Sequence, residues 1–296
     1  MFVHNPVMLK EVLEYLNPQP GNVFIDATIN GGGHAKAITE RIGKTGKLLG
    51  IDRDREIVEK FSLFTFQFPI QKFIVVCDSF AEIKKIAERE DFVDADGILF
   101  DLGFSSFHIE SSGRGFSFLR DESLDMRYDP TVGPSAQEII NSWPEENLVH
   151  MLFQFGEERY ARRIAKRIRE ERQKKRIETT NRLVEIIRKA VPLRYRQGRI
   201  HFATRTFQAL RICVNDELEH VAKGVRGALS VIKSGGRIAV ISFHSVEDRV
   251  VKNIFKEYEK EREIKRVIKK PVTPSRDELK EHPRSRSAKL RVIERI

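Results

Sequence analysis

Chemically useful residues stand at the ends of the strands predicted in the first part of the chain. The apolar run Val23–Asp26 leads into three consecutive glycines, residues 31–33, and then into a helical pattern that begins near His34. Glycine lacks a Cβ atom and lets the backbone approach a ligand closely, and a helix start points unpaired N–H groups at that ligand. A second strand, Lys47–Asp52, ends in an acid about twenty residues later, where a carboxylate can accept hydrogen bonds from ribose hydroxyls. The pattern predicts a Rossmann-like half-domain that binds a nucleotide-type cofactor.

Two departures from the dinucleotide-binding pattern indicate which cofactor this is. Lys36 stands where the last glycine of G-x-G-x-x-G is expected, and Asp26 ends the first strand. A carboxylate at that place suits a cationic ligand better than a pyrophosphate. S-adenosylmethionine carries a sulfonium, an α-ammonium and a ribose diol but no phosphate, so it fits this polarity. The glycines alone are equally compatible with a flexible turn, with Asp52 merely capping its strand.

The fourth predicted strand, residues 97–101, ends in Asp101, at the place where methyl acceptors meet the cofactor in this type of fold. Enzymes that methylate exocyclic amines of bases often have an acid or amide there, followed by Pro-Pro and an aromatic residue. Here Leu102 and Gly103 replace the prolines, and Phe104 follows. An exocyclic amine is a poor nucleophile, so Asp101 would help by accepting its N–H and aiming the nitrogen, while Phe104 stacks on the base. The alternative is that Asp101 caps a loop or binds only the cofactor.

Two more strand ends carry residues with two interpretations. Phe80 follows the third predicted strand, residues 73–76, and is either a core aromatic or a contact for the adenine of a bound cofactor. His244 ends the strand 236–244 and is more typical of a hydrogen-bonded structural histidine than of a base. No cluster with metal-ligand spacing stands out, so no metal is predicted.

The composition is that of a globular protein with a polyanionic partner. The chain has 296 residues, of which 40% are hydrophobic and 20 are Phe, enough for a real core. Lys plus Arg number 53 against 43 Asp plus Glu, a net charge of +10, which favours nucleic acid over a membrane because no long apolar anchor is present. Cys77 and Cys213 are too few for a disulfide framework, and the first residues do not resemble a signal peptide, so a cytoplasmic location is predicted.

The elements that must position these residues are separated by a long insertion. Over 130 residues lie between Leu102 and the strand 236–244, whereas a crossover needs a dozen to a few dozen. We take 216–229 as the crossover helix, which predicts a discontinuous cofactor-binding domain, 1–109 and 213–296, and an inserted helical domain, 110–212. Helical patterns in the insert cover 135–141, 144–155, 157–175, 180–191 with Thr180 or Asn181 as N-cap, and 205–214. Residues 269–287 have the composition of a basic loop, and the alternation in 288–296 predicts an edge strand.

The positive charge is concentrated in the insert. Residues 157–199 hold 16 Lys or Arg against 6 Asp or Glu, so this segment alone carries the net charge of the whole chain. A helix with this many cations would follow a phosphate backbone well. The plainer alternative for any one such run is a solvated helix face, but the position next to a predicted cofactor site favours nucleic-acid binding.

Taken together, the motifs resemble those of the bacterial RsmH (MraW) family, ribosomal RNA small-subunit cytosine-N4 methyltransferases. The resemblance spans nearly the whole chain in the right order and rests on these segments: His4-x-Pro-Val-Met8, Asp26-Ala-Thr28, Gly31-Gly-Gly-His34, Gly50-Ile-Asp-Arg-Asp54, Asp101-Leu-Gly-x-Ser-Ser106, Arg114-Gly-Phe-Ser-Phe118, Leu124-Asp-Met-Arg127, Phe155-Gly-Glu-Glu-Arg159, Thr204-Arg-Thr-Phe-Gln208 and Ser242-Phe-His-Ser245.

The resemblance implies a class I methyltransferase fold with an inserted helical recognition domain, S-adenosylmethionine as methyl donor, and a decoding-region cytidine of 16S rRNA as acceptor. By matching position, it implies these cofactor contacts: Gly32, Gly33, His34, Asp52, Phe80, Asp101 and His108. The family commonly has Gln where this chain has His108, and a glycine is frequent where it has Asn30.

The resulting hypothesis is methyl transfer to cytosine N4 in the small ribosomal subunit, with Asp101 as the acceptor of the proton that N4 loses. Three rivals stay open at this point. They are a non-catalytic RNA-binding assembly factor with a vestigial fold, an NAD-dependent oxidoreductase, and a DNA amine methyltransferase. Cofactor titration tests the oxidoreductase, and a turnover assay tests the non-catalytic assembly factor. The nucleic acid that is methylated tests the DNA methyltransferase.

Overall fold

The protein is described by a computed structural model that covers residues 6–62, 68, 70–103, 109 and 112–296. The chain forms two compact units, unit 1 with Met1–Phe104 and Leu218–Ile296, and unit 2 with Ser105–Glu217. The sequence predicts a somewhat shorter insert, residues 110–212. No helix in the described part of the chain is long and apolar enough to cross a membrane.

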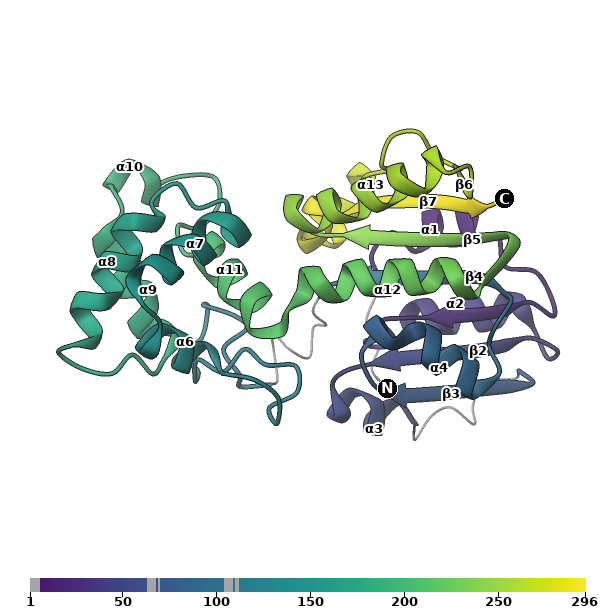
Figure 1. Cartoon of the computed structure of the whole chain (residues 1–296), viewed down its shortest axis with the longest axis horizontal. Coiled ribbons are helices and arrows are strands. Elements are labelled where there is room, and N and C mark those ends of the chain that lie inside the picture. The colour runs from purple at the N-terminus through teal and green to yellow at the C-terminus, as the bar shows by residue number, and fades with distance from the viewer. Residues whose placement is uncertain (1–5, 63–67, 69, 104–108, 110–111) are drawn as a thin grey trace. The chain divides into compact units, whose positions relative to one another are not determined.

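Unit 1 is built on a sheet that has seven strands over the described residues, in the order β3-β2-β1-β4-β5-β7-β6 (Figure 1). Neighbours from β3 to β5 are parallel, whereas β5–β7 and β7–β6 are antiparallel. The chain order reverses between β1 and β4, and at such a switch point the carboxyl ends of the strands border a ligand crevice. The strands are β1 Val23–Asp26, β2 Lys47–Asp52, β3 Lys72–Cys77, β4 Ala95–Leu102, β5 Ile232–Ser242, β6 Ile264–Arg266 and β7 Lys289–Arg295.

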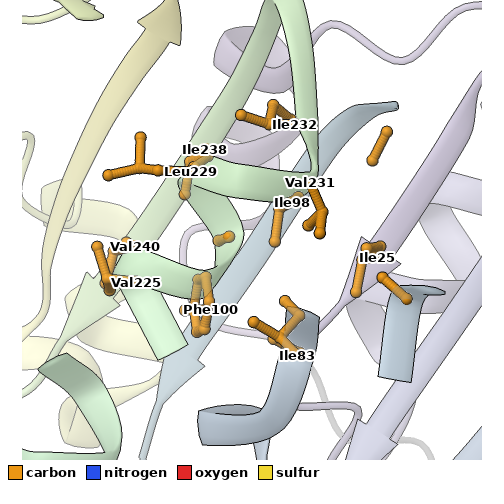
Figure 2. Packing of buried hydrophobic residues seen from close by; sticks show 14 of the residues in the cluster. Ile25, Ile83, Ile98, Phe100, Val225, Leu229, Val231, Ile232, Ile238 and Val240 are labelled. Atoms are coloured by element: carbon orange, nitrogen blue, oxygen red, sulfur yellow. The ribbon is translucent and has the colours of Figure 1, made fainter. Parts of the chain in front are cut away.

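Helices cover both faces of this sheet, because alternate strand residues are apolar on each side. Ile25, Ile98 and Phe100 face the helices α4, α12 and α13 in one continuous cluster (Figure 2). On the other side α1 and α2 contact the strands, and they bury residues such as Val12 and Ile38. The helices of unit 1 are α1 Leu9–Leu16, α2 Gly33–Ile42, α3 Arg55–Ser62, the 3₁₀ turn η2 Phe80–Glu82, α4 Ile83–Glu90, α12 Glu217–Val231, α13 Ser245–Lys260, α14 Arg276–Glu281 and the 3₁₀ turn η3 Pro283–Ser287.

Unit 2 is helical over its described residues and has a hydrophobic cluster of its own, to which its helices contribute residues such as Ile140, Leu152, Ile164, Ile187 and Leu210. Its helices are α6 Ala136–Ser142, α7 Glu145–Gly156, α8 Ala161–Arg172, α9 Thr180–Ala190, α10 Leu193–Arg196 and α11 Thr204–Asn215.

Two predictions for the insert are wrong in detail. The helix expected over 157–175 begins only at Ala161, because Glu157 ends α7 in the left-handed conformation (φ 49°) and residues 157–160 make a turn. The N-cap of α9 is Thr179 rather than Thr180 or Asn181, since the Thr179 side chain accepts the hydrogen bond from the Arg182 N–H.

The C-terminal part differs more from the prediction. The strand expected at the sheet edge, β7, lies inside the sheet between β5 and β6. The short strand β6 is the edge instead, and its three residues carry too little pattern to be predicted. The segment 269–287, expected as a loop, contains α14, which begins at the N-cap Ser275, and η3.

Candidate active site

The glycine turn after β1 is held between two strands. The Ala27 N–H donates to the Leu99 carbonyl of β4 (2.9 Å), and the Ile29 N–H donates to the Ile51 carbonyl of β2 (2.9 Å). Gly32 follows with φ 73°, and a Cβ atom there would lie 1.9 Å from the ring of Phe61. This position therefore needs glycine both for its backbone conformation and for the room beside it. Gly33 is the first residue of α2.

Asp52 is fixed at the end of β2 by two backbone donors. Its Oδ2 accepts the Asn30 N–H at 3.0 Å, and its Oδ1 accepts the Asp54 N–H at 2.9 Å. Asn30 has φ 46°, so it adopts the left-handed conformation that Asn tolerates better than most residues. The Asp52 carboxylate therefore joins the end of β2 to the glycine turn.

Asp101 and His34 meet at the carboxyl end of β4. His34 Nδ1 lies 3.6 Å from Asp101 Oδ2, and His34 Nε2 lies 3.1 Å from the Val7 carbonyl oxygen. A carbonyl only accepts hydrogen bonds, so Nε2 carries the proton, and Nδ1 faces the Asp101 carboxyl. The Asp101 N–H donates to Thr28 Oγ1 at 2.6 Å, which joins β4 to the segment after β1.

A second buried carboxyl group lies at the end of β1. Asp26 Oδ1 accepts the Thr28 N–H at 3.2 Å. Among the described residues, Asp26 Oδ2 and Asp101 Oδ1 are buried without any hydrogen-bond partner. Buried acceptors are nearly always satisfied in folded proteins, so these two oxygens indicate a place for a ligand that donates hydrogen bonds or carries positive charge.

Burial is the main cause of the raised pKa values of the Asp26 and Asp101 carboxyl groups. It raises the pKa of Asp26 to about 7, with a smaller contribution from the charge of Asp52. It raises the pKa of Asp101 to about 8, with additions from the charges of Asp26 and Glu247. Carboxyl groups with strongly raised pKa values are typical of functional sites.

Glu247 is a site residue that the sequence did not single out. Its Oε2 accepts the Phe243 N–H at 2.9 Å, and its Oε1 lies 2.9 Å from His244 Nε2. His244 Nδ1 in turn accepts the Glu247 N–H at 3.3 Å as the N-cap of α13. His244 therefore has the structural role that its position favoured. In the sequence, only the position of Glu247 as the third residue of the helix after His244 could have pointed to it.

The remaining predicted contacts have different outcomes. Phe80 lies in η2, directly after β3, and packs edge to face on Phe100 at 5.7 Å between ring centroids, so it is at least part of the core. His108 and Phe104 lie outside the described residues. The structure thus brings His34 and Asp101 together and links Asp52 to the glycine turn, whereas a cofactor contact of Phe80 stays a prediction.

Comparison with known proteins covers the whole chain. A family model described as the MraW methylase family matches residues 1–296. The chain is 45% identical to the Ribosomal RNA small subunit methyltransferase H of Persephonella marina over 296 residues, 100% of both chains. It is 43% identical to the protein of the same name from Syntrophotalea carbinolica over 311 residues, 100% of this chain and 99% of the relative. Among solved structures it is similar to an rRNA methylase from Streptococcus thermophilus, with a TM-score of 0.44, 9% identity, and coverage of 97% of this chain and 93% of that chain. The chain belongs to the MraW methylase family.

Proposed function

We propose that this protein transfers a methyl group from S-adenosylmethionine to N4 of a cytidine in the decoding region of 16S rRNA, within the small ribosomal subunit in the cytoplasm. The observation that carries the chemistry is the Asp101 carboxyl group, which is buried at the end of β4 with Oδ1 unpartnered. The relatives named as small-subunit rRNA methyltransferases support the choice of acceptor.

The polar groups at the carboxyl ends of β1, β2 and β4 fit S-adenosylmethionine. Asp26 Oδ2 and Asp101 Oδ1 offer unpartnered acceptors to a ligand that carries an ammonium and a sulfonium. Asp52 places its carboxylate at the end of β2, where it would accept hydrogen bonds from a ribose diol. The turn at Gly32 leaves no space for a side chain. The residues that would hold the cofactor are Gly32, Gly33, His34, Asp52, Phe80 and Asp101, with His108 by family resemblance only. When bound, the cofactor would supply an electrophilic methyl carbon, whose bond to the positively charged sulfur breaks as the amine nitrogen bonds to it, so that a neutral thioether leaves.

Asp101 has two tasks in this proposal. As a carboxylate it accepts a hydrogen bond from the cytosine amine and so orients a nitrogen whose lone pair is delocalised into the ring. The amine loses one N–H proton as it gains the methyl group, and Asp101 takes that proton. Its raised pKa makes it a stronger base than a surface aspartate.

The inserted unit would hold the RNA. Its segment 157–199 carries most of the excess positive charge, and counterion release from phosphates gives such a surface affinity for any RNA strand. A base in folded rRNA must leave its stack before an amine can be attacked in line, so local unfolding or base flipping is part of the proposal.

The test is methyl transfer from radiolabelled S-adenosylmethionine to unmodified small ribosomal subunits, with free 16S rRNA and DNA as alternative acceptors. The product is digested to nucleosides. We expect label in N4-methylcytidine from subunits, and loss of that label in the Gly33→Asp variant. Tight cofactor binding without label on any nucleic acid would overturn the proposal, and label on DNA alone would make the protein a DNA amine methyltransferase.

A further inference from the structure

The turn between α7 and α8, residues 156–160, is fixed by α11. A Cβ atom on Gly156 would lie 2.5 Å from the Arg205 carbonyl oxygen, so α11 approaches the turn as closely as a backbone can. Gln208 Nε2 donates to the Phe155 carbonyl at 2.9 Å, and Arg205 Nη1 donates to the Glu157 carbonyl at 3.3 Å. These side chains satisfy carbonyls that the end of α7 leaves open, so the turn is preformed.

A buried carboxylate arranges two aromatic rings at this turn. Glu158 is fully buried, and its Oε1 accepts the Tyr160 N–H at 2.8 Å while its Oε2 accepts the Tyr195 hydroxyl at 2.7 Å. The rings of Tyr160 and Tyr195 then pack edge to face with centroids 4.9 Å apart. Desolvation, followed by the hydrogen bond to Glu158, raises the pKa of Tyr195 to about 12, so its hydroxyl remains a donor at any physiological pH.

Two arginines lie over these rings. The Arg159 guanidinium carbon is 5.0 Å from the Tyr160 ring centroid and 4.7 Å from that of Tyr195, and the Arg163 guanidinium carbon is 5.8 Å from Tyr160. Both side chains are exposed. Neither forms an ion pair with any described residue, whereas Arg167, Arg169 and Arg182 are all paired with glutamates. The stacked guanidinium groups are thus ordered and not neutralised by an acid.

We propose that Arg159 and Arg163, held on the Tyr160–Tyr195 platform, form a binding site for phosphodiester groups of the RNA strand. A guanidinium group stacked on a ring keeps its N–H donors in its own plane, where they can form paired hydrogen bonds to phosphate oxygens. Stacking also removes much of the side-chain freedom that an isolated arginine loses on binding. The adjacent N-terminus of the 12-residue helix α8 adds a favourable field for an anion. The strand is the rRNA substrate only if the proposed function holds.

Binding of unmodified 16S rRNA, measured without S-adenosylmethionine over a range of salt concentrations, tests this site. The variant is Arg159→Gln/Arg163→Gln, which removes both charges and retains most of the side-chain stems. The matched control is Arg188→Gln/Lys189→Gln on α9, which removes two exposed charges from the same unit. We expect the first variant to bind at least about tenfold more weakly and to lower the slope of log K against log salt by about 2, with little change in the control.

Two further readouts separate the possible outcomes. The Kd for S-adenosylmethionine and the thermal midpoint should stay at the wild-type values in both variants, and in the methyl-transfer assay the KM for the RNA acceptor should rise with kcat little changed. Equal weakening in both variants would mean that the charge acts diffusely, and no weakening in either would mean that the platform does not touch RNA. Either result overturns the inference. If rRNA binding depends on Arg159 and Arg163 but no methyl transfer occurs, the proposed function fails and the phosphate site stands.

Discussion

The carboxyl group of Asp101 binds a proton in the folded protein at pH values where it would be ionised in the unfolded chain. Its pKa is about 8 in the fold against an ordinary value of 3.8. A carboxyl group whose pKa is raised by folding stabilises the folded state fully below about pH 4, where it is protonated in both states. This stabilisation is lost as the pH rises towards 8. Asp26, with a pKa of about 7, acts in the same direction. The site therefore costs the protein stability under the conditions in which Asp101 must ionise.

Replacing Asp101 by Asn should consequently raise the stability of the protein and slow methyl transfer. At pH 8.5 we expect Asp101→Asn to increase the free energy of unfolding by about 2 to 5 kcal/mol, because one pKa unit corresponds to about 1.4 kcal/mol. Near pH 4 the difference should nearly vanish. Urea unfolding at both pH values measures this, with the exposed Asp277→Asn as control. An unfolding free energy that is lower than that of the wild type at pH 8.5 would contradict the assigned acidity.

Methyl transfer should depend on the same ionisation. We expect kcat/KM for S-adenosylmethionine to rise with pH and level off above about 8, because only the carboxylate accepts the amine proton and kcat/KM reports the free enzyme. Asp101→Asn should lower kcat by about 10²- to 10⁴-fold, the usual contribution of a general base. Initial rates at S-adenosylmethionine concentrations well below KM, measured between about pH 6 and 9 on either side of the Asp101 pKa of about 8, provide the measurement. An unchanged pH profile in the variant would assign the proton to another group.

The sequence identified this site in part. Asp26, Asp52 and Asp101 stand at strand ends, so a pattern of apolar runs was enough to place them at one edge of the sheet. The pairing of His34 with Asp101, and the field of Glu247 on Asp101, depend on how α2 and α13 pack, and no local spacing encodes that.

At the scale of elements, the connection from β1 to α2 is held on both sides. Its backbone is bonded to both neighbouring strands, and Phe61 of α3 fills the space over Gly32. Binding a ligand against such a connection requires little reorganisation, which favours affinity.

Gly32→Ala should therefore weaken cofactor binding beyond what backbone strain explains. The control is Gly43→Ala at the other end of α2, which also has a positive φ (63°) but has nothing within 4 Å of its would-be Cβ. We expect both variants to lose at least about 1 to 2 kcal/mol of stability because of the positive φ, and Gly32→Ala to lose more because its Cβ clashes with Phe61. Only Gly32→Ala should raise the Kd for S-adenosylmethionine by about tenfold or more, equivalent to 1.4 kcal/mol. Titration calorimetry measures both Kd values. Equal Kd values for the two variants would show that the glycine turn is not part of the cofactor site.

The elements themselves were largely predictable, and the predicted Rossmann-like α/β fold is confirmed. Strand β2 and the helices α6 and α11 lie within a residue or so of their expected bounds, because each has a clear apolar period. The predicted start of α8 was wrong because residues 157–160 have helical composition. Long-range contacts hold them in a turn, namely the buried hydrogen bonds of Glu158 and the hydrogen bonds from Arg205 and Gln208 of α11. The place of β7 was wrong because alternation shows that a strand is half buried but not which strands flank it.

At the scale of the whole molecule, each unit has its own hydrophobic cluster. The cluster of unit 1 joins the sheet to α4, α12 and α13, and the cluster of unit 2 joins α6 to α11 with the preceding loop. All the described residues proposed to hold the cofactor belong to unit 1, whereas the strongly basic segment 157–199 belongs to unit 2. Ligand binding should therefore stabilise the two units unequally.

Hydrogen exchange with and without S-adenosylhomocysteine measures this difference. At a ligand concentration of 100 times its Kd, we expect the amides of β1, β2 and β4 to gain up to about 2.7 kcal/mol of protection. The amides of α8 and α9 should change little, and addition of rRNA should reverse the pattern. Equal protection of both units by the cofactor analogue would show that they unfold as a single cooperative body.

The insertion of unit 2 also sets the order in which the chain can fold during its own synthesis. Strands β4 and β5 are parallel neighbours in the sheet, yet the ribosome must translate all of residues 103–231 before β5 emerges. At about 5 to 20 residues per second this interval lasts many seconds, far longer than a helical unit needs to collapse. Unit 2 can thus be complete while the apolar edge of β4 is still bare, and that nascent edge is where a chaperone would be needed.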